Sequence, residues 1–320
     1  MRVLITGGAG FIGSHLADYH LSRNNQVTVV DNLSTGTLNN LKHHLKNPLF
    51  TFYNENIASW PGLSSALSDC DLVYHMAAVL GMFNVIEHPI DTLHMNIDAT
   101  RRLLSLAAKQ DNQPTVLIAS SSEVYGSKSG AMNELDPLIL DATNKAHSSY
   151  PISKLANEND AFLYHKKFNL PIIVIRLFNT VGPRQLSKYG MVIPRFIEQA
   201  ANNNPLTIFG DGKQTRSFCD VRDICEIFYR LSQTQNSLGE IINVGHETAI
   251  SIIELAKLTK TITHSNSSYE FLDTEEIFHH DYLNIKHRKP DLNKLFKLID
   301  YQYQWTLKTT INDMLTHLKI

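Results

Sequence analysis

The chain has 320 residues, of which 43% are hydrophobic and 19% are charged, and its formal net charge is −2. This length leaves room for one large α/β unit and a smaller lobe. The balanced charge indicates no nucleic-acid partner, and the absence of any run of about 18 apolar residues indicates no membrane span.

Cysteine and histidine are present, but neither forms a recognisable metal or redox motif. The three cysteines form no CxxC pair and have no histidine at metal-ligand spacing. We therefore expect reduced thiols and a cytoplasmic location. The pairs His43/His44 and His279/His280 lack a third ligand at useful spacing. We interpret them as solvated surface histidines and predict no metal site.

Short apolar runs alternate with amphipathic stretches through the first half of the chain. The runs that have the length and composition of buried parallel strands are Val3–Thr6, Val27–Asp31, Leu49–Tyr53, Leu72–His75, Val116–Ala119 and Ile172–Leu177. Helical sequence or a turn follows each of them. This order predicts an α/β fold with a doubly wound parallel sheet and right-handed crossovers.

The chain changes character after about Gly182, where proline and glycine divide it into shorter elements. We expect a smaller, interleaved α/β lobe in this part of the chain. The predicted division gives residues 1–180 to the large lobe, with 219–247 packing back on it, and gives residues 181–218 and 248–320 to the smaller lobe.

Two helices are predicted in this second part. The pattern of Val221–Leu231 is that of a helix that packs on the large lobe. Ser251 and Glu254 form a capping-box pattern directly before an apolar helical run. This pattern predicts a helix that begins at Ile252 and has a structural role.

The first predicted strand runs into a glycine-rich turn with the spacing GxxGxxG, and a helix follows. The residues of this turn assigned to a cofactor are Gly7, Gly10, Phe11, Ile12 and Gly13. Glycine lets the backbone approach a pyrophosphate, whose charge then faces the N-terminus of the helix. The second strand ends in Asp31, whose carboxylate would accept hydrogen bonds from ribose hydroxyls and repel a 2′-phosphate. The sequence predicts a Rossmann-type site that prefers NAD to NADP.

Tyr150 and Lys154 are four residues apart, so on a helix they share one face. An ammonium near a phenol favours the phenolate and lowers a phenol pKa that is ordinarily about 10. The predicted strand Val116–Ala119 leads directly to Ser120, Ser121, Ser122 and Glu123, at the sheet edge where open α/β sheets bind their ligands. The sequence therefore predicts a tyrosine that acts as a base near this edge.

The motifs GGAGFIG, VVDNLSTG, HMAA, SSSEVYG, YxxxK and RLFNTVGPRQ follow one another along the chain. In this order the chain resembles the extended short-chain dehydrogenase/reductase family, among the NAD-dependent nucleotide-sugar epimerases and dehydratases, and most of all UDP-glucose 4-epimerases. The resemblance covers nearly the whole chain. It implies a Ser121–Tyr150–Lys154 triad that oxidises the sugar at its 4-position, and a homodimer.

The same resemblance implies further contacts to the two ligands. Additional cofactor contacts would come from Asn32, Ser34, Asn56, Ile57, Ala77, Ala78 and Asn96. Asn56 stands where the family usually has aspartate, so we expect weaker recognition of the adenine. The nucleotide sugar would be held by Asn179, Val192, Arg216 and Arg288. Within QTRSF and HRKPD, the two arginines match family positions that bind the substrate diphosphate.

The sequence leaves the reaction open. A UDP-sugar 4-epimerase needs only the triad, and overall resemblance favours it. Glu123 suggests the alternative of a UDP-glucuronate decarboxylase or a nucleotide-sugar dehydratase, because both often carry a carboxylate there. Ser122 replaces the aspartate that dTDP-glucose 4,6-dehydratases place before that glutamate, so their acid is missing. A remote alternative is a non-catalytic NAD-binding sensor.

Overall fold

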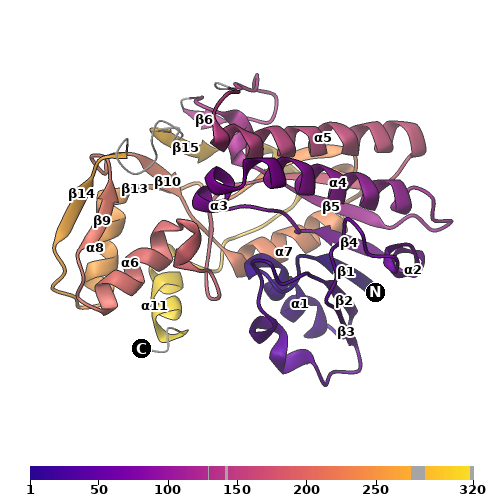
Figure 1. Cartoon of the computed structure of the whole chain (residues 1–320), viewed down its shortest axis with the longest axis horizontal. Coiled ribbons are helices and arrows are strands. Elements are labelled where there is room, and N and C mark those ends of the chain that lie inside the picture. The colour runs from indigo at the N-terminus through magenta and orange to yellow at the C-terminus, as the bar shows by residue number, and fades with distance from the viewer. Residues whose placement is uncertain (129, 141–142, 275–284, 318–320) are drawn as a thin grey trace.

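The computed structural model describes residues 1–128, 130–140, 143–274 and 285–317, and a seven-stranded sheet forms its centre (Figure 1). Neighbouring strands of this sheet are all parallel. In sheet order they are β12 (Glu240–Val244), β7 (Ile172–Leu177), β5 (Thr115–Ser121), β4 (Leu72–His75), β1 (Arg2–Thr6), β2 (Gln26–Val30) and β3 (Phe50–Tyr53). The strand order reverses between β1 and β4, which confirms the predicted doubly wound α/β fold.

Helices cover both faces of this sheet, so its strands are apolar on both sides. On β1, Val3 and Ile5 face one core cluster, and Leu4 faces the other. The first face is covered by α1 (Phe11–Leu21), α7 (Val221–Ser232) and α10 (Asn293–Leu298). The second face is covered by α2 (Leu63–Ser68), α4 (Pro89–Ala107) and α5 (Ser149–Phe168). Figure 1 shows α4 and α5 side by side, and the two helices pack along each other.

The predicted elements agree with the structure except at some ends. The strand Ile172–Leu177 is confirmed residue for residue, and α8 (Ile252–Ile262) begins with the predicted capping box. β5 extends beyond the predicted Ala119 as far as Ser121, so the serine of the triad lies within the strand. β12 was not predicted as a strand, because its short sequence carries the polar residues Glu240 and Asn243.

A second group of elements lies beside the large sheet and has a hydrophobic cluster of its own (Figure 1). A four-stranded sheet there has the order β13 (Ala249–Ser251), β10 (Thr215–Ser217), β15 (His287–Pro290) and β6 (Ala131–Met132). Two smaller sheets pair β9 (Leu206–Phe209) with β14 (Tyr269–Leu272), and β8 (Thr180–Val181) with β11 (Cys219–Asp220). Its helices are α6 (Val192–Ala201), α8 and α11 (Leu307–His317). The remaining short helices are α3 (Met82–Glu87), η1 (Leu38–His44), η2 (Ser122–Tyr125), η3 (Ala146–Ser148), η4 (Ser187–Tyr189) and η5 (Gln235–Ser237).

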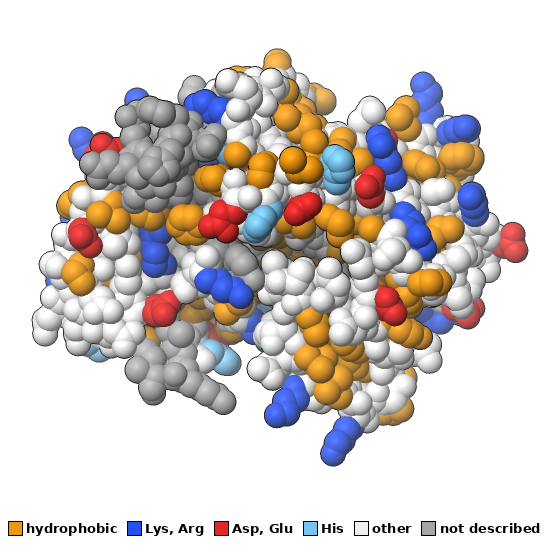
Figure 2. Space-filling view, viewed as in Figure 1, with side chains coloured by type: hydrophobic (Ala, Val, Ile, Leu, Met, Phe, Trp, Pro, Cys, Tyr) orange, Lys and Arg blue, Asp and Glu red, His pale blue; other side chains and the backbone are white. Residues whose placement is uncertain are grey.

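The two groups of elements exchange segments. β6 precedes α5 in the chain but pairs with β15, while α10 follows β15 and packs on β12. Because of this exchange, the division of the chain into two lobes at the predicted residue boundaries remains a prediction. Charged side chains of both signs are mixed over the face seen in Figure 2, as the small net charge suggests. Among the described residues, no helix combines the length and apolar character needed to cross a membrane.

Candidate active site

A cavity of about 640 Å³ extends from the carboxyl ends of the central strands to α6, β10 and β15. The predicted cofactor residues that line it are Gly7, Gly10, Phe11, Ile12, Gly13, Asp31, Asn32, Ser34, Asn56, Ile57, Ala77, Ala78 and Asn96. The predicted catalytic and substrate residues that line it are Ser121, Ser122, Glu123, Tyr150, Lys154, Asn179, Val192, Arg216 and Arg288. The fold thus brings together residues from most of the chain at one sheet edge, as expected for a doubly wound sheet.

The glycine turn between β1 and α1 has the shape that a pyrophosphate requires. Gly7 has a φ of +69°, and a Cβ atom there would lie 2.7 Å from the backbone nitrogen of Ala77. A Cβ atom on Gly13 would overlap the carbonyl oxygen of Gly7. Among the described residues, Gly10 gives α1 no side-chain cap, and the first residues of this helix line the cavity, so their backbone N–H groups are available to an anion there. These features fit the diphosphate of NAD.

Asp31 lies at the end of β2, where its carboxylate already takes part in the turn. Oδ2 accepts a hydrogen bond from the backbone N–H of Ala9 at 2.9 Å, and Oδ1 accepts one from Leu33 at 2.8 Å. Burial raises the pKa of this carboxyl, and the backbone N–H groups oppose the shift. A carboxylate offers about four lone-pair sites, so these backbone bonds leave acceptor capacity for a ribose hydroxyl, which is the role predicted for Asp31.

Three predicted cofactor residues use their side-chain amides within the protein. Asn32 accepts from Ser34 N–H at 3.1 Å, and Asn56 accepts from the backbone two residues on at 3.0 Å. Asn96 donates from Nδ2 to Ser153 at 3.1 Å and also bonds both backbone groups of Val79. Since both N–H groups of Asn96 are engaged, this residue positions the loop after β4 beside the cofactor site.

The three residues of the predicted triad converge on the cavity. Ser121 ends β5, while Tyr150 and Lys154 lie on the first turns of α5. The Lys154 ammonium donates to the carbonyl of Ala119 at 2.8 Å and lies 5.7 Å from the centre of the Tyr150 ring. The Ser121 hydroxyl lies near enough to the phenol of Tyr150 to favour its ionised form and so to lower its pKa, and it accepts a hydrogen bond from Glu123 N–H at 3.2 Å.

The electrostatics of the triad differ from the sequence prediction. Burial and then the carboxylate of Glu123 raise the pKa of the Tyr150 phenol, although Ser121 and Arg288 oppose the shift. Burial also lowers the pKa of Lys154 to about 8, with Glu158 opposing. With the protein's own groups the predicted lowering of the Tyr150 pKa is not found, because loss of hydration outweighs the two groups that oppose it, Ser121 and Arg288.

Glu123 and Arg288 face each other beside Tyr150. The Nη1 atom of Arg288 lies 3.6 Å from Oε1 of Glu123, and the side chains are 10% and 45% exposed. The Nε atom of Arg288 is buried and has no hydrogen-bond partner among the described residues. The chain therefore places an opposite-charge pair, with spare guanidinium N–H donors, where the sugar ring is expected.

The remaining predicted substrate residues lie farther along the cavity. Arg216, on β10, donates from Nη1 to the carbonyl oxygens of Thr215 at 2.8 Å and Ile285 at 2.9 Å. This fixes one side of its guanidinium group. Asn179 follows β7, Val192 begins α6, and both line the same cavity.

Comparison with known proteins shows to which family the chain belongs. The model of the NAD dependent epimerase/dehydratase family matches residues 3–245. UDP-N-acetyl-alpha-D-glucosaminuronate decarboxylase of Bacillus cytotoxicus is 37% identical over 97% of this chain and 96% of its own length. The chain belongs to the NAD-dependent epimerase/dehydratase family. This membership confirms the family resemblance, and NAD is the cofactor that the glycine turn and Asp31 fit.

Two further relatives bear on the reaction. UDP-glucuronic acid decarboxylase 2 of Arabidopsis thaliana is 33% identical over 96% of this chain and 66% of its own length. The crystal structure of UDP-glucuronic acid 4-epimerase from Bacillus cereus with UDP-glucuronic acid and NAD is 32% identical. It covers 99% of this chain and 98% of its own, with a TM-score of 0.87. Relatives of this NAD-dependent enzyme thus include both decarboxylases and epimerases.

A buried charge network under the triad was missed by the sequence analysis. Glu158, one turn after Lys154 on α5, accepts from the Ser120 hydroxyl at 2.5 Å. Its two carboxylate oxygens also bind Arg176 in a bidentate pair at 3.0 and 2.8 Å. This network joins β5 and β7 to α5 and holds a negative charge near the lysine. The spacing of Tyr150, Lys154 and Glu158 along one helix face was the available signal.

One titratable side chain of the cavity, His147, was also missed. Both of its ring nitrogens are buried without a hydrogen-bond partner among the described residues, and the residue lines the cavity just before Tyr150. No spacing in the sequence indicates this position, since it depends on which segments the fold brings together. Arg195 also lines the cavity, where it lies over the ring of Phe209 at 4.1 Å, and burial lowers its pKa to about 10.

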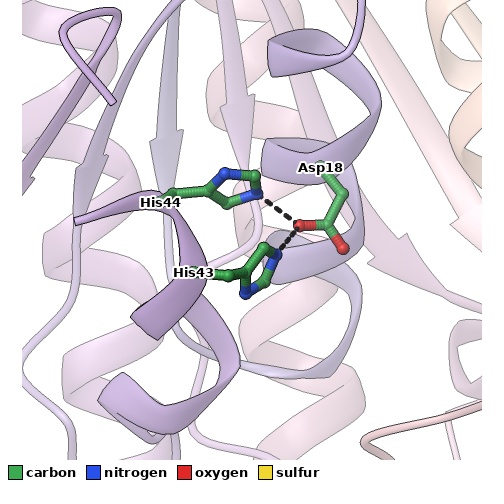
Figure 3. A group of neighbouring side chains, drawn as sticks. All are labelled: Asp18, His43 and His44. Carbon is green, nitrogen blue, oxygen red and sulfur yellow. Dashed lines mark hydrogen bonds and ion pairs between the residues drawn. The ribbon is translucent and has the colours of Figure 1, made fainter. Parts of the chain in front are cut away.

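The prediction for His43 and His44 needs correction. These neighbours in η1 do have a third potential ligand, because the fold places Asp18 of α1 against both rings (Figure 3). The sequence analysis looked for that ligand nearby in the chain and so missed it. His279 and His280 lie outside the described residues.

Proposed function

We propose that this enzyme is a UDP-uronate decarboxylase, which oxidises the sugar of UDP-glucuronate or its 2-acetamido analogue at C4 and releases C6 as carbon dioxide. The observation that carries the proposal is the pair of Glu123 and Arg288 beside Tyr150. The relatives named decarboxylases support it. The sequence analysis favoured epimerisation, and the side-chain pair moves our preference to its alternative.

The triad provides the first step of the proposed reaction. Tyr150 as phenolate takes the proton of the C4 hydroxyl while the C4 hydride leaves the sugar. NAD, held by the glycine turn and Asp31, would supply reversible hydride transfer at this carbon. Because the protein's own groups raise the pKa of Tyr150, proton removal depends on cations near the phenol, namely Lys154 and the oxidised cofactor ring.

Glu123 and Arg288 account for the second step. Oxidation at C4 makes the sugar a β-keto acid, so the C5–C6 bond can break and leave its electron pair in a C4 enolate. Arg288 would bind the substrate carboxylate and then the enolate, while the negative charge of Glu123 favours loss of a carboxylate as neutral carbon dioxide. C5 then takes a proton, C4 regains its hydride, and Tyr150 returns the proton to O4.

Epimerisation at C4 is the second candidate, because the triad alone is sufficient for it. One observation favours it: the side chain of Glu123 is 45% exposed, and its distance of 3.6 Å from Arg288 is longer than a strong ion pair. The epimerase from Bacillus cereus, which was solved with UDP-glucuronic acid, supports a uronate substrate for this reaction as well.

Product mass separates the two candidates. We would incubate the enzyme and NAD with UDP-glucuronate and with UDP-N-acetylglucosaminuronate, and follow the products by chromatography and mass spectrometry. Loss of carbon dioxide is the expected result. A product of unchanged mass would overturn the decarboxylase proposal in favour of epimerisation.

A substitution tests the role of Glu123 in that assay. In Glu123→Gln we expect decarboxylation to fall by about 10²-fold or more, while the absorbance of reduced NAD shows that oxidation at C4 continues. Glu270→Gln, at an exposed position of β14, is the matched control and should behave as wild type. Equal activity of both variants would exclude Glu123 from the chemistry.

We also propose a homodimer in the cytoplasm. Exposed apolar side chains on α4 and α5, namely Ile90, Leu163 and Phe168, support an interface across these helices. The three cysteines are free and buried, which supports a reducing compartment. Light scattering should give twice the mass of one chain, and a monomer would exclude the proposed assembly.

A further inference from the structure

Two histidines of η1 and an aspartate of α1 meet at the protein surface, away from the triad. The Nε2 atoms of His43 and His44 lie 2.8 and 2.6 Å from the same oxygen of Asp18, Oδ1. Figure 3 shows both rings pointing from η1 toward α1, with the carboxylate between them and the helix. All three potential ligand atoms lie within 4.8 Å of one another.

The carboxylate of this group is oriented by another residue. Arg184, in the loop after β8, donates from Nη2 to Oδ2 of Asp18 at 2.6 Å. Oδ2 is thereby engaged, and Oδ1 is turned toward the two imidazoles. Metal-ligating carboxylates usually have such an outer hydrogen-bond partner, which fixes their direction.

We propose that Asp18, His43 and His44 bind one divalent transition-metal ion of the zinc class. Two imidazoles and one carboxylate form a donor set that such ions accept, and water would complete a tetrahedron. Bond lengths of about 2.0–2.2 Å require donor atoms about 3.3 Å apart, so each ring must move away from the carboxylate by less than about 1 Å. Each histidine binds as the neutral form with its proton on Nδ1.

The local geometry makes such a movement feasible. His44 has a side chain that is 14% exposed and is held by packing, whereas His43 is 50% exposed and free to adjust. The two rings are 3.9 Å apart, so small rotations are sufficient to aim both at one ion. The guanidinium of Arg184 lowers the affinity for a cation, so we expect micromolar binding, weaker than a closed structural zinc site.

A metal ion here would stabilise the cofactor site. Just before and within η1, Thr37 N–H and the Asn40 amide both donate to the carbonyl of Ala9 in the glycine turn, at 3.1 and 2.9 Å. The ion would join η1 to α1 on the other side of that turn. Metal binding and NAD binding should therefore strengthen each other by the same factor, as linkage requires.

The direct test is metal titration of chelator-treated, tag-free enzyme. We expect one Zn²⁺ per chain by calorimetry, and visible absorption bands of tetrahedral cobalt when Co²⁺ is the probe. His43→Gln should weaken both by about 10-fold or more, because it removes one ligand from the exposed side of the site. Wild-type affinity in this variant, or no binding of either ion, would overturn the proposal.

A matched control separates this site from nonspecific surface binding. His317 lies 3.3 Å from Asp313 on α11, so it forms another exposed histidine–aspartate pair without a second imidazole. His317→Gln should leave the affinity for Zn²⁺ unchanged, and an equal loss in both variants would contradict the assignment. NAD binding by His43→Gln without metal should match wild type, which shows that the cofactor site is intact and keeps this test independent of the proposed reaction.

Discussion

The cofactor half and the substrate half of the cavity are built in different ways. The cofactor half depends on backbone shape: Gly7, Gly13 and Asp31 act through a turn that leaves no room for larger side chains. The substrate half depends on side-chain charge, with Glu123 after β5 meeting Arg288 on β15. One half is a property of a short continuous segment, and the other is created by the fold.

This difference has a consequence for function in the family. A site that is shaped mainly by the backbone keeps binding its cofactor through most changes of the surrounding side chains, because its shape permits little variation. A site made of a few side chains can change its reaction by one substitution while the fold stays the same. Substitutions in the two halves should therefore affect different measurements, and the largest effect should come from the triad between them.

Tyr150→Phe should give the largest loss. The change removes the proton acceptor but keeps the ring, so kcat should fall by about 10³-fold, which is about 4 kcal/mol in the activation barrier. NAD should remain bound at wild-type affinity, because the glycine turn is untouched. Tyr164→Phe on the same helix is the matched control. If the two variants lose similar activity, Tyr150 is not the base.

Gly13→Ala should damage the cofactor half alone. An alanine in a helix normally adds about 1 kcal/mol of stability relative to glycine. At this position the added methyl overlaps the backbone of Gly7, so we expect instead a loss of about 1–3 kcal/mol. If the strain falls on the bound turn, NAD affinity drops by about 10- to 100-fold. Fluorescence titration with NAD and thermal melting would measure both, and unchanged NAD binding would contradict a backbone-defined site.

The two halves were also unequally predictable from the sequence. The glycine turn, Asp31 and the capping box at Ser251 are local patterns, and the structure places each where its spacing indicated. Strand β12 was missed because Glu240 and Asn243 interrupt its apolar run. Local sequence patterns identify turns and helix caps. They do not identify a strand such as β12, whose burial comes from its neighbours in the fold and not from an apolar run of its own.

The substrate half shows the other limit of sequence reasoning. Arg288 and Glu123 were named on resemblance, but their contact depends on the fold, which pairs β15 with β6 a few residues after Glu123. The raised pKa of Tyr150 depends on burial, which no spacing reveals. Likewise, Asp18 could not be matched to His43 before α1 and η1 were placed together. Contacts between distant segments and loss of hydration are properties of the folded chain.

Asp31→Asn tests a charged side chain in the cofactor half of the cavity. The amide keeps the shape of the carboxylate but loses its charge, so repulsion of a 2′-phosphate ends. One unit of charge close to a partly hydrated phosphate is worth about 1 kcal/mol, so the preference for NAD over NADP should fall by about five- to tenfold. Dissociation constants for both cofactors would measure this ratio. A variant that keeps the full preference would place the discrimination in the backbone instead.

The smallest expected effect is a pH dependence that reports on Lys154. Its pKa is lowered to about 8 by burial, so the ammonium is present below that pH and is lost as the pH rises through it. Because the charged form stabilises the Tyr150 phenolate, kcat/KM should fall by about threefold between about pH 7.5 and 8.5. In Lys154→Arg the guanidinium stays charged, so activity should be lower overall but should show no decline in that range. A decline that persists in the arginine variant would assign the titration to a group other than Lys154.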